Sequence, residues 1–453
     1  MKQVIIQYGG TGDLSRKKLI PAYFELFHKG YDLTILFLGR RFDSREEFIE
    51  NMTSEEIRDD DFLKAVEYIR YDMKEESDNL KVLQVLQKQL SDTEEIELIY
   101  YLALHPDLYE QAVEGIKKIN TYLGDGVRKK VVVEKPFGFD YETAVTYNEV
   151  LKHAFTDEEI FRVDHYLGKE FIQNLLVLRF KNDIIHGIWN KDFIDHIQIV
   201  IDEDSGIETR LDYYEKTGVI RDMVQNHVLQ ILSNLAIGEP IELNQKEIAY
   251  EKVKIMRAVR PSGDFTVGRY KGIEDGGKTP TFFASTFYVD TFEFAGVPFF
   301  VRTGKMMPTG QSFIYIQFKE FRSPEKRTQH TPPNSLIIEI QPNMKIDMML
   351  NVKKPGKFSE VDGVKLNFDH FQTFRINTPE AYEQIVQKIL EGDKILFPSE
   401  EEIKHSWKLI DPLIEQSADK EIDFYESGSV PESAVELIEK HGRCWYGLCG
   451  DGS

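Results

Sequence analysis

The sequence predicts an α/β, Rossmann-type N-terminal domain followed by a larger α+β domain whose sheet is mostly antiparallel. Up to about residue 160, short apolar runs alternate with helical patterns, which is typical of a parallel, doubly wound sheet. A glycine-rich turn follows the first apolar run. In the second half, strand-like runs at 196–201, 286–302, 312–318 and 335–341 follow one another with little helix between them.

Length and composition limit the class of protein. The chain has 453 residues, enough for two large domains. Its 41% hydrophobic and 29% charged residues are typical of a soluble globular protein. It begins without a signal-peptide pattern, and no apolar run reaches the roughly 18–20 residues of a membrane span. We therefore expect a cytoplasmic protein.

Charge and cysteine content exclude several partners. The net charge of −21 disfavours nucleic acid and anionic membranes, so a phosphorylated ligand would need a local cluster of Lys and Arg. The two cysteines, Cys444 and Cys449, are too few for a disulfide scaffold and form a weak metal motif. We assign the pair no structural role, and we expect a reducing compartment and no bound metal.

The first apolar run, residues 3–8, leads through the glycine turn into a helical pattern that Pro21 should kink or break. A pyrophosphate can approach backbone N–H groups at a helix start only where glycine leaves room. The spacing departs from G-x-G-x-x-G, so by itself it also fits a surface turn. Its place after the first strand favours a dinucleotide. The expected cofactor residues here are Gly9, Thr11, Gly12, Asp13 and Leu14.

The end of the second strand, residues 33–38, selects the type of dinucleotide. An acidic residue there would bind ribose hydroxyls, whereas arginine accommodates a 2′-phosphate. The sequence continues with Arg40 and Arg41, which favours NADP. Use of NAD as well stays open, as does a solvated pair of arginines.

A later strand ends at Glu134 and is followed by Lys135 and Pro136. Ligands bind at the carboxyl ends of the strands in open α/β sheets, so Lys135 can meet both cofactor and substrate. A solvated lysine in a turn is the alternative. The isomer of the bond before Pro136 is open.

Residues 162–170 place a carboxylate, an imidazole, a phenol and an ammonium around one glycine. Two cations, Arg162 and Lys169, together with the hydroxyl of Tyr166, suit an anionic ligand such as a phosphate ester. A polar helix start is the alternative interpretation.

A helix predicted over residues 214–237 carries Asp222 and His227. Five residues of α-helix correspond to about 500° of rotation, so the two side chains should diverge by roughly 140°. The near-neutral pKa of histidine suits a base that accepts a hydroxyl proton. A structural histidine is the alternative.

Four strings, at residues 9–14, 134–138, 162–170 and 222–227, together resemble the glucose-6-phosphate dehydrogenase family over nearly the whole chain. The resemblance implies oxidation of D-glucose 6-phosphate to 6-phospho-D-glucono-1,5-lactone with hydride transfer to NADP⁺, the first step of the oxidative pentose phosphate pathway. It also implies that His227 is the base and that Asp164 orients it.

The resemblance further implies a set of substrate residues, in which His165, Tyr166 and Lys169 hold the phosphate. The full set is Lys18, Lys135, His165, Tyr166, Lys169, Glu203, Asp222 and Lys305. Two departures stand out. Phe42 replaces the family's usual arginine, and Glu339 replaces an arginine that binds a second, structural NADP in some animal members. We expect that second NADP to be absent.

We expect a dinucleotide-binding domain over 1–160, a substrate-binding and oligomerisation domain over 161–453, and assembly as a homodimer or a dimer of dimers. One alternative is a related sugar or sugar-phosphate dehydrogenase. Another is a catalytically silent NADP-binding or regulatory protein.

Overall fold

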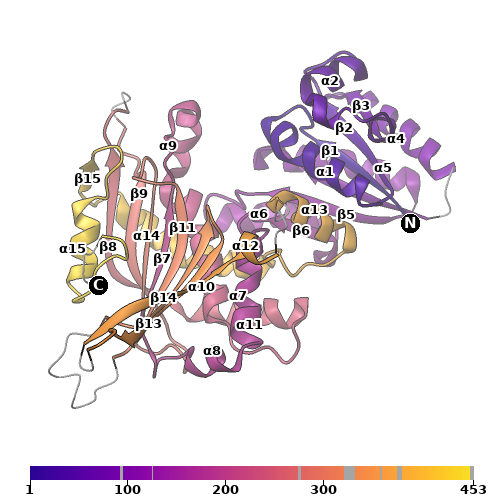
Figure 1. Cartoon of the computed structure of the whole chain (residues 1–453). Helices are drawn as coiled ribbons and strands as arrows, with labels where there is room; N and C mark the ends of the chain where they lie inside the picture. Colours follow the sequence, from indigo (N-terminus) through magenta and orange to yellow (C-terminus); the bar gives the residue numbers. More distant parts are fainter. Residues whose placement is uncertain are drawn as a thin grey trace. The chain divides into compact units, whose positions relative to one another are not determined.

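The computed structural model divides the chain into two compact units, shown in Figure 1. The first unit comprises Met1–Gly168 and Pro379–Lys404, and the second comprises Lys169–Thr378 and His405–Ser453. The residues that the structure describes are 1–91, 95–124, 126–273, 277–320, 332–357, 360–374 and 380–448.

The first unit holds a six-stranded, wholly parallel sheet in the order β3-β2-β1-β4-β5-β6. Its strands are β1 (Lys2–Tyr8), β2 (Leu33–Gly39), β3 (Val66–Arg70), β4 (Ile96–Leu102), β5 (Arg128–Glu134) and β6 (Ile160–Val163). Its helices are η1 (Ser15–Leu19), α1 (Ile20–His28), α2 (Arg45–Met52), η2 (Glu55–Ile57), α3 (Asp60–Lys64), α4 (Glu76–Ser91), η3 (Pro106–Leu108), α5 (Tyr109–Leu123), α6 (Tyr141–Lys152), η4 (Asp157–Glu159) and α13 (Ala381–Glu391).

Both faces of this sheet are covered by helices. Alternate residues of β1, such as Val4 and Ile6, join the core formed with α4, α5 and α6. The opposite face packs against α1, where Tyr23 contacts Phe37 of β2, and α13 lies beside α1. Strands buried on both faces are almost continuously apolar, as Val131–Val133 illustrates. The expected α/β Rossmann-type domain is confirmed.

The helix after the glycine turn consists of two parts. Ser15–Leu19 is a π-helix, and the α-helix α1 begins at Ile20 with Pro21 in its first turn. The two parts are continuous, because the N–H of Ile20 donates to the carbonyl of Ser15. Pro21 stands where π-helix changes to α-helix, and the expectation of a break is wrong, because the backbone stays helical through Leu19 and Ile20.

The second unit holds a nine-stranded sheet in the order β14-β13-β12-β11-β7-β10-β9-β8-β15. Its strands are β7 (Ile194–Asp202), β8 (Val259–Tyr270), β9 (Phe282–Val289), β10 (Pro298–Gly304), β11 (Gln311–Phe318), β12 (Ser335–Gln341), β13 (Lys345–Lys353), β14 (Val361–Asp369) and β15 (Ile422–Tyr425). Its helices are α7 (Glu170–Phe180), α8 (Asp183–Ile188), η5 (Glu208–Arg210), α9 (Leu211–Val219), η6 (Ile220–Val228), α10 (Leu229–Ala236), α11 (Gln245–Ala258), α12 (His370–Phe374) and α15 (Glu432–Glu439), and α14 (Glu400–Ser417) begins in the first unit.

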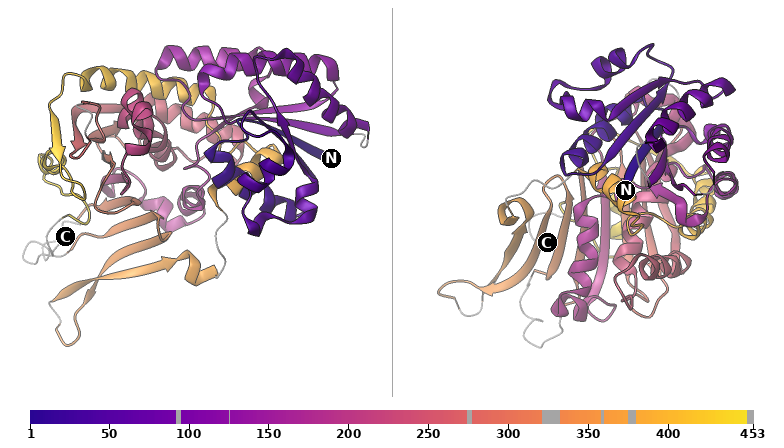
Figure 2. Two further views of the ribbon diagram at one scale, coloured as in Figure 1. Left: turned by 90° about the horizontal axis from the view of Figure 1, so that it is seen from above. Right: turned by 90° about the vertical axis from the view of Figure 1, so that its right-hand side faces the viewer.

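Most neighbours in this sheet are antiparallel, as the sequence predicted. The exceptions are β7 with β10 and β8 with β15, which pair in parallel. The run predicted over 286–302 is two strands, β9 and β10, and β8 was not predicted. The hairpin formed by β13 and β14 lies at one edge of the sheet, and Figure 2 shows it extending away from the helices of its unit.

The predicted continuous α-helix over 214–237 is wrong. Gly218 has φ 62° and ψ 171°, which ends α9 because only glycine adopts this backbone conformation readily. The next segment, η6, is a π-helix whose hydrogen bonds join residues five apart rather than four. Asp222 and His227 are therefore one π-helical turn apart and lie on nearly the same face, so the expected divergence of about 140° is also wrong.

The interpretation of the cysteine pair needs correction as well. Cys444 is disulfide-bonded. A turn over residues 446–448, with Gly447 at φ 81°, reverses the chain directly after Cys444. Cys449 lies outside the described residues.

Candidate functional site

The glycine turn fills a tightly packed place at the end of β1. A Cβ atom on Gly9 would lie 2.2 Å from the carbonyl oxygen of Ala103, and one on Gly10 would lie 2.9 Å from Cβ of Phe37. The N–H of Gly12 donates to the carbonyl of Gly9 at 3.0 Å, which closes the turn. Glycine is thus required where the chain leaves the sheet. Because glycine has no side chain, the backbone of the turn can lie close to a ligand in the adjacent cleft.

A cleft of about 630 Å³ opens at the carboxyl ends of the parallel strands in the first unit. Its volume lies within the usual range of small-molecule sites, and its position is that of ligands in open α/β sheets. Four predicted cofactor residues line the cleft, namely Gly9, Thr11, Arg40 and Arg41. Gly12, Asp13 and Leu14 belong to the same turn but do not line the cleft, and Asp13 pairs with Lys17 at 3.3 Å.

Two arginines and an unpredicted lysine give this cleft its charge. Arg40 and Arg41 are both exposed, and Arg40 forms an ion pair with Asp72 at 3.6 Å. Lys74, just after β3, also lines the cleft, and only its position behind a strand end could have indicated it. Phe42 is buried beneath Tyr68, whose hydroxyl accepts from the Phe42 N–H at 3.2 Å. The position of the family's usual arginine is thus occupied by a core residue.

The end of β5 is built around the buried carboxyl group of Glu134. Tyr101 donates to it at 2.5 Å, and Tyr382 of α13 donates at 3.3 Å. Burial raises the pKa of Glu134 to about 7, against the opposing effect of the two tyrosine hydrogen bonds. The next bond, Lys135–Pro136, is cis. The sequence did not indicate Tyr382, because it comes from a segment almost 250 residues away.

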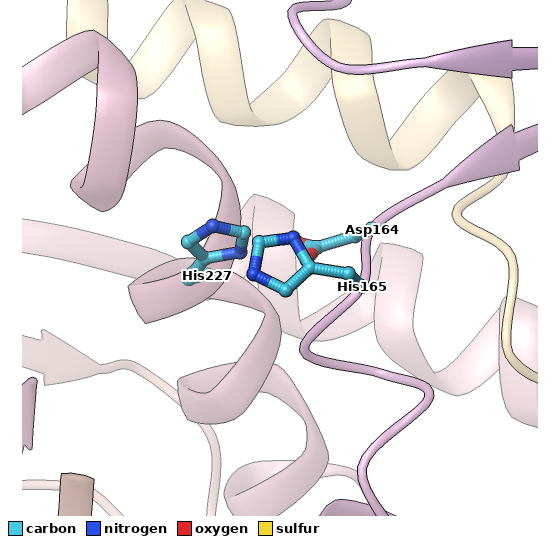
Figure 3. Close-up of side chains that lie close together, drawn as sticks. All are labelled: Asp164, His165 and His227. Atoms are coloured by element: carbon cyan, nitrogen blue, oxygen red, sulfur yellow. The ribbon is translucent and has the colours of Figure 1, made fainter. Parts of the chain in front are cut away.

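The segment after β6 makes a tight turn at Asp164. The carboxylate of Asp164 accepts from the N–H of Tyr166, and its carbonyl accepts from the N–H of Leu167, both at 3.0 Å. The ring of His165 lies parallel to that of Tyr382, with centroids 6.4 Å apart. Figure 3 shows the side chains of Asp164 and His165 on this segment, and that of His227 on η6.

The other residues of this motif differ in their surroundings. Arg162, predicted to attract an anion, is buried and pairs with Asp157 at 3.0 Å. That expectation is wrong, because the guanidinium is already bound within the fold. Tyr166 is 3% exposed. Lys169 is half-buried and donates to the side-chain oxygen of Gln341.

Three predicted substrate residues of the second unit meet around one buried ammonium group. The Nζ atom of Lys305 lies 3.1 Å from the carboxylate of Asp222 and is hydrogen-bonded to Glu203. Parallel pairing places Gly304 opposite Asp202, so Lys305 and Glu203 follow neighbouring strand ends. Tyr214, which the sequence did not indicate, lies beneath the ammonium at 5.7 Å. Two carboxylates and one ammonium at a strand end can bind several hydroxyl groups.

The remaining predicted residues have separate environments. The side chain of His227 is buried, with 1% of the residue exposed, and its backbone N–H donates to Asn226 Oδ1 at 2.5 Å. Lys18 is exposed and pairs with Glu380 at 3.0 Å. Glu339 accepts from the side chain of Asn343 at 2.9 Å.

Comparisons with known proteins agree along the whole chain. Residues 5–174 match the family model described as "Glucose-6-phosphate dehydrogenase, NAD binding domain", and residues 176–446 match its C-terminal domain. A glucose-6-phosphate 1-dehydrogenase of Bacillus subtilis (strain 168) is 35% identical over 99% of each chain. A cytoplasmic glucose-6-phosphate 1-dehydrogenase of Arabidopsis thaliana is 34% identical, covering 97% of this chain and 93% of the relative.

A solved structure supports the same assignment. A glucose-6-phosphate dehydrogenase in complex with glucose 6-phosphate superposes with a TM-score of 0.90 and 31% identity, covering 98% of each chain. Fold and family models together place the chain among the dehydrogenases that have a nicotinamide-dinucleotide-binding domain. More narrowly, it belongs to the glucose-6-phosphate dehydrogenase family. Within the described residues, no helix is both long enough and apolar enough to cross a membrane.

The buried carboxyl group of Glu134 generates a prediction about stability. Its pKa is about 7 in the folded chain and ordinarily 4.5, so the folded state binds the proton more tightly. The stabilisation that comes from this tighter proton binding is fully present below about pH 4.5 and is lost as the pH rises through about 7. The free energy of unfolding changes by on the order of 3 kcal/mol over this interval. Glu134→Gln should therefore become more stable relative to wild type as the pH rises over this interval.

Urea unfolding at a series of pH values measures this difference in free energy of unfolding. Glu110→Gln, at an exposed position in the same unit, is the matched control. A constant difference for Glu134→Gln would contradict the raised pKa.

Proposed function

We propose that the chain oxidises D-glucose 6-phosphate at C1 to 6-phospho-D-glucono-1,5-lactone, with NADP⁺ as the preferred acceptor. The observation that carries this proposal is the cluster of Glu203, Asp222 and Lys305, which offers hydrogen-bonding groups to a polyhydroxylated substrate. This cluster lies in a chain that belongs to the glucose-6-phosphate dehydrogenase family over both of its units.

In this proposal, His227 accepts the proton of the C1 hydroxyl group. An imidazole suits the task because its pKa lies near neutrality. Asp164 orients the ring and stabilises the imidazolium, while Asp222, one π-helical turn before His227, accepts from a sugar hydroxyl. A nicotinamide cofactor bound in the cleft of the first unit would supply the acceptor for the C1 hydride.

The phosphate of the substrate is assigned to His165, Tyr166 and Lys169. A protonated or neutral imidazole, a phenol and an ammonium are all hydrogen-bond donors, which matches the acceptor-only phosphate oxygens. Lys18 and Lys135 complete the substrate set. Lys135 also belongs to the cofactor set because it follows a strand end of the parallel sheet.

The cleft beside the glycine turn fits a dinucleotide. A Cβ atom at Gly9 would collide with the backbone, so the turn can exist only with glycine there. The residues that would hold the cofactor are Gly9, Thr11, Gly12, Asp13, Leu14, Arg40, Arg41 and Lys135. Arg41 is best suited to a 2′-phosphate, since Arg40 is paired with Asp72. Lys74 offers a further cation, and we propose NAD⁺ as a weaker second acceptor.

The direct test is formation of NADPH from NADP⁺ with glucose 6-phosphate and, separately, with free glucose. The proposal requires a much higher kcat/KM for the phosphorylated sugar. Equal values would favour a related sugar dehydrogenase. Binding of NADP⁺ without turnover of either sugar would favour a catalytically silent protein.

We further propose a cytoplasmic homodimer or dimer of dimers. The edge hairpin exposes four apolar side chains, which supports a contact with another copy, and they are Leu350, Val352, Val364 and Leu366. Light scattering on the full chain measures the mass, and a monomer at micromolar concentration would refute this assembly. Fractionation of the source cells tests the location.

His227→Asn should keep substrate binding but reduce kcat by roughly 10²–10⁴-fold, the usual contribution of general-base catalysis. Steady-state kinetics with both substrates saturating measure the effect. His186→Asn, at an exposed position of the same unit, serves as control and should leave kcat unchanged. A near-normal kcat for the His227 variant would remove this residue from the mechanism.

Lys169→Ala should raise KM for glucose 6-phosphate by about 10- to 150-fold, because a charge-assisted hydrogen bond contributes about 1.5–3 kcal/mol. Its effect on the oxidation of free glucose should be small. Lys181→Ala, near the end of the same helix, is the matched control. An equal loss with both sugars would show that Lys169 does not contact the phosphate.

Arg41→Ala should lower kcat/KM for NADP⁺ much more than for NAD⁺, since only NADP⁺ carries the 2′-phosphate. Arg40→Ala alone should have the smaller effect, because Arg40 is already paired with Asp72. The double variant tests both arginines, and the ratio of the two kcat/KM values cancels general damage to the fold. An unchanged ratio in the double variant would show that neither arginine reads the 2′-phosphate.

A further inference from the structure

A second cavity, of about 700 Å³, lies wholly within the second unit, where α9 ends and η6 begins. Its walls are the end of α9 and the first residues of η6, the segment 278–280 before β9, and residues 414–424 between α14 and β15. None of the substrate or cofactor residues assigned above lines it. Its volume is in the usual range for small-molecule sites.

The cavity is basic, although the chain as a whole has a net charge of −21. Among the residues that the structure describes, four cationic side chains and two carboxylates line it, and the cations are Lys216, Arg221, Lys278 and Lys420. One carboxylate, Glu215, is already engaged, because it accepts from Arg269 at 3.0 Å and from Thr279 at 2.7 Å. Among the described residues, no carboxylate pairs with Lys216 or Lys278, and both are exposed. Their ammonium groups can therefore bind an anion.

An aromatic ring adds a second kind of binding surface. Phe424 lines the cavity and is 53% exposed, which is unusual for a phenylalanine. Ile414, Ile422 and Pro280 make the neighbouring wall apolar. An exposed ring beside several ammonium groups suits a ligand with an aromatic base at one end and phosphates at the other, since bases stack on aromatic side chains.

The cavity wall is connected to the helix that carries the proposed base. The N–H of Val219 donates to the carbonyl of Pro280 at 3.1 Å, which joins the 278–280 segment to the start of η6. Arg221 lines the cavity, and the next residue, Asp222, is bonded to Lys305. A ligand held by Lys278 and Arg221 would thus act on the first turn of η6, and His227 follows one π-helical turn later.

We propose that this cavity is a regulatory site for a nucleoside polyphosphate, whose phosphates contact Lys216, Lys278 and Arg221 and whose base stacks on Phe424. Binding there changes the position of Asp222 on η6 and so changes the affinity for the sugar substrate. The regulatory part rests on the proposed function, whereas binding itself does not.

Calorimetric titration of the full chain with ATP tests binding without any need for turnover. Lys216→Ala/Lys278→Ala should weaken ATP by about 100-fold or more, since each lost charge-assisted bond costs about 10- to 150-fold. Lys181→Ala/Lys246→Ala, two exposed lysines of the same unit outside the cavity, is the matched control and should bind ATP normally. Absence of ATP binding to wild type would overturn the proposal.

Two further binding experiments identify the site that ATP occupies and the part of ATP that is recognised. Phe424→Ala should weaken ATP by roughly 5- to 150-fold and leave inorganic tripolyphosphate unchanged, because only ATP has a base to stack. Equal affinities of wild type for ATP and tripolyphosphate would refute the nucleotide assignment. If Arg40→Ala/Arg41→Ala abolished ATP binding and Lys216→Ala/Lys278→Ala did not, ATP would occupy the cofactor cleft and the proposal would be wrong.

The regulatory part is measured by kinetics at saturating NADP⁺. ATP should shift KM for glucose 6-phosphate by about 5-fold or more, the usual lower range of coupling between two sites. The shift should disappear in Lys216→Ala/Lys278→Ala, whose kinetics without ATP should match wild type. A shift that persists in this variant would exclude the cavity as its origin. Absence of turnover would refute the proposed function but leave the binding result valid.

Discussion

The parallel pairing of β7 with β10 determines the arrangement of the charged groups in the second unit. Asp202 and Arg302, on these two strands, form a buried ion pair at 2.8 Å. One residue beyond Asp202 lies Glu203, which meets Lys305. Removing one partner of a buried ion pair costs about 3–5 kcal/mol, because a charge is left without compensation. The pairing of these two strands, the buried ion pair between them and the charged groups around Lys305 therefore depend on one another.

Local patterns were sufficient to predict the Rossmann-type class of the first unit, but not that residues 379–404 belong to it. A buried parallel strand is apolar along its length, so Val131–Val133 and its counterparts could be recognised as strands without any knowledge of their partners. Gly9 marked the end of β1 because no other residue tolerates that approach to Ala103. The residues of the cluster around Lys305 were also named from the sequence, although only through the resemblance to a family. Spacing alone gave no reason to join Glu203 to Lys305 across about 100 residues.

Two kinds of feature could not be predicted from the sequence: contacts between distant segments of the chain, and the type of helix that a helical pattern forms. Tyr382 reaches Glu134 from a part of the chain that the pattern showed only as a helix. Arg162 stands in a motif rich in charge, yet it pairs with Asp157, because a motif does not indicate which members face a ligand. The sequence of η6 does not reveal its π-helical form, since α- and π-helices turn in the same direction and differ by one residue per hydrogen-bonded loop.

The π-helical geometry of η6 has a consequence for comparing related sequences. In an α-helix, neighbours on one face are three or four residues apart, whereas Asp222 and His227 share a face at a separation of five. The segment therefore contains one residue more than an α-helix needs to present the same two side chains. A homologue with a regular α-helix here would present them with a spacing of four, and a correct alignment would then contain a gap of one residue inside a helix. Searches that forbid gaps within helices, or that require a fixed spacing, would separate such proteins although their side chains coincide in space.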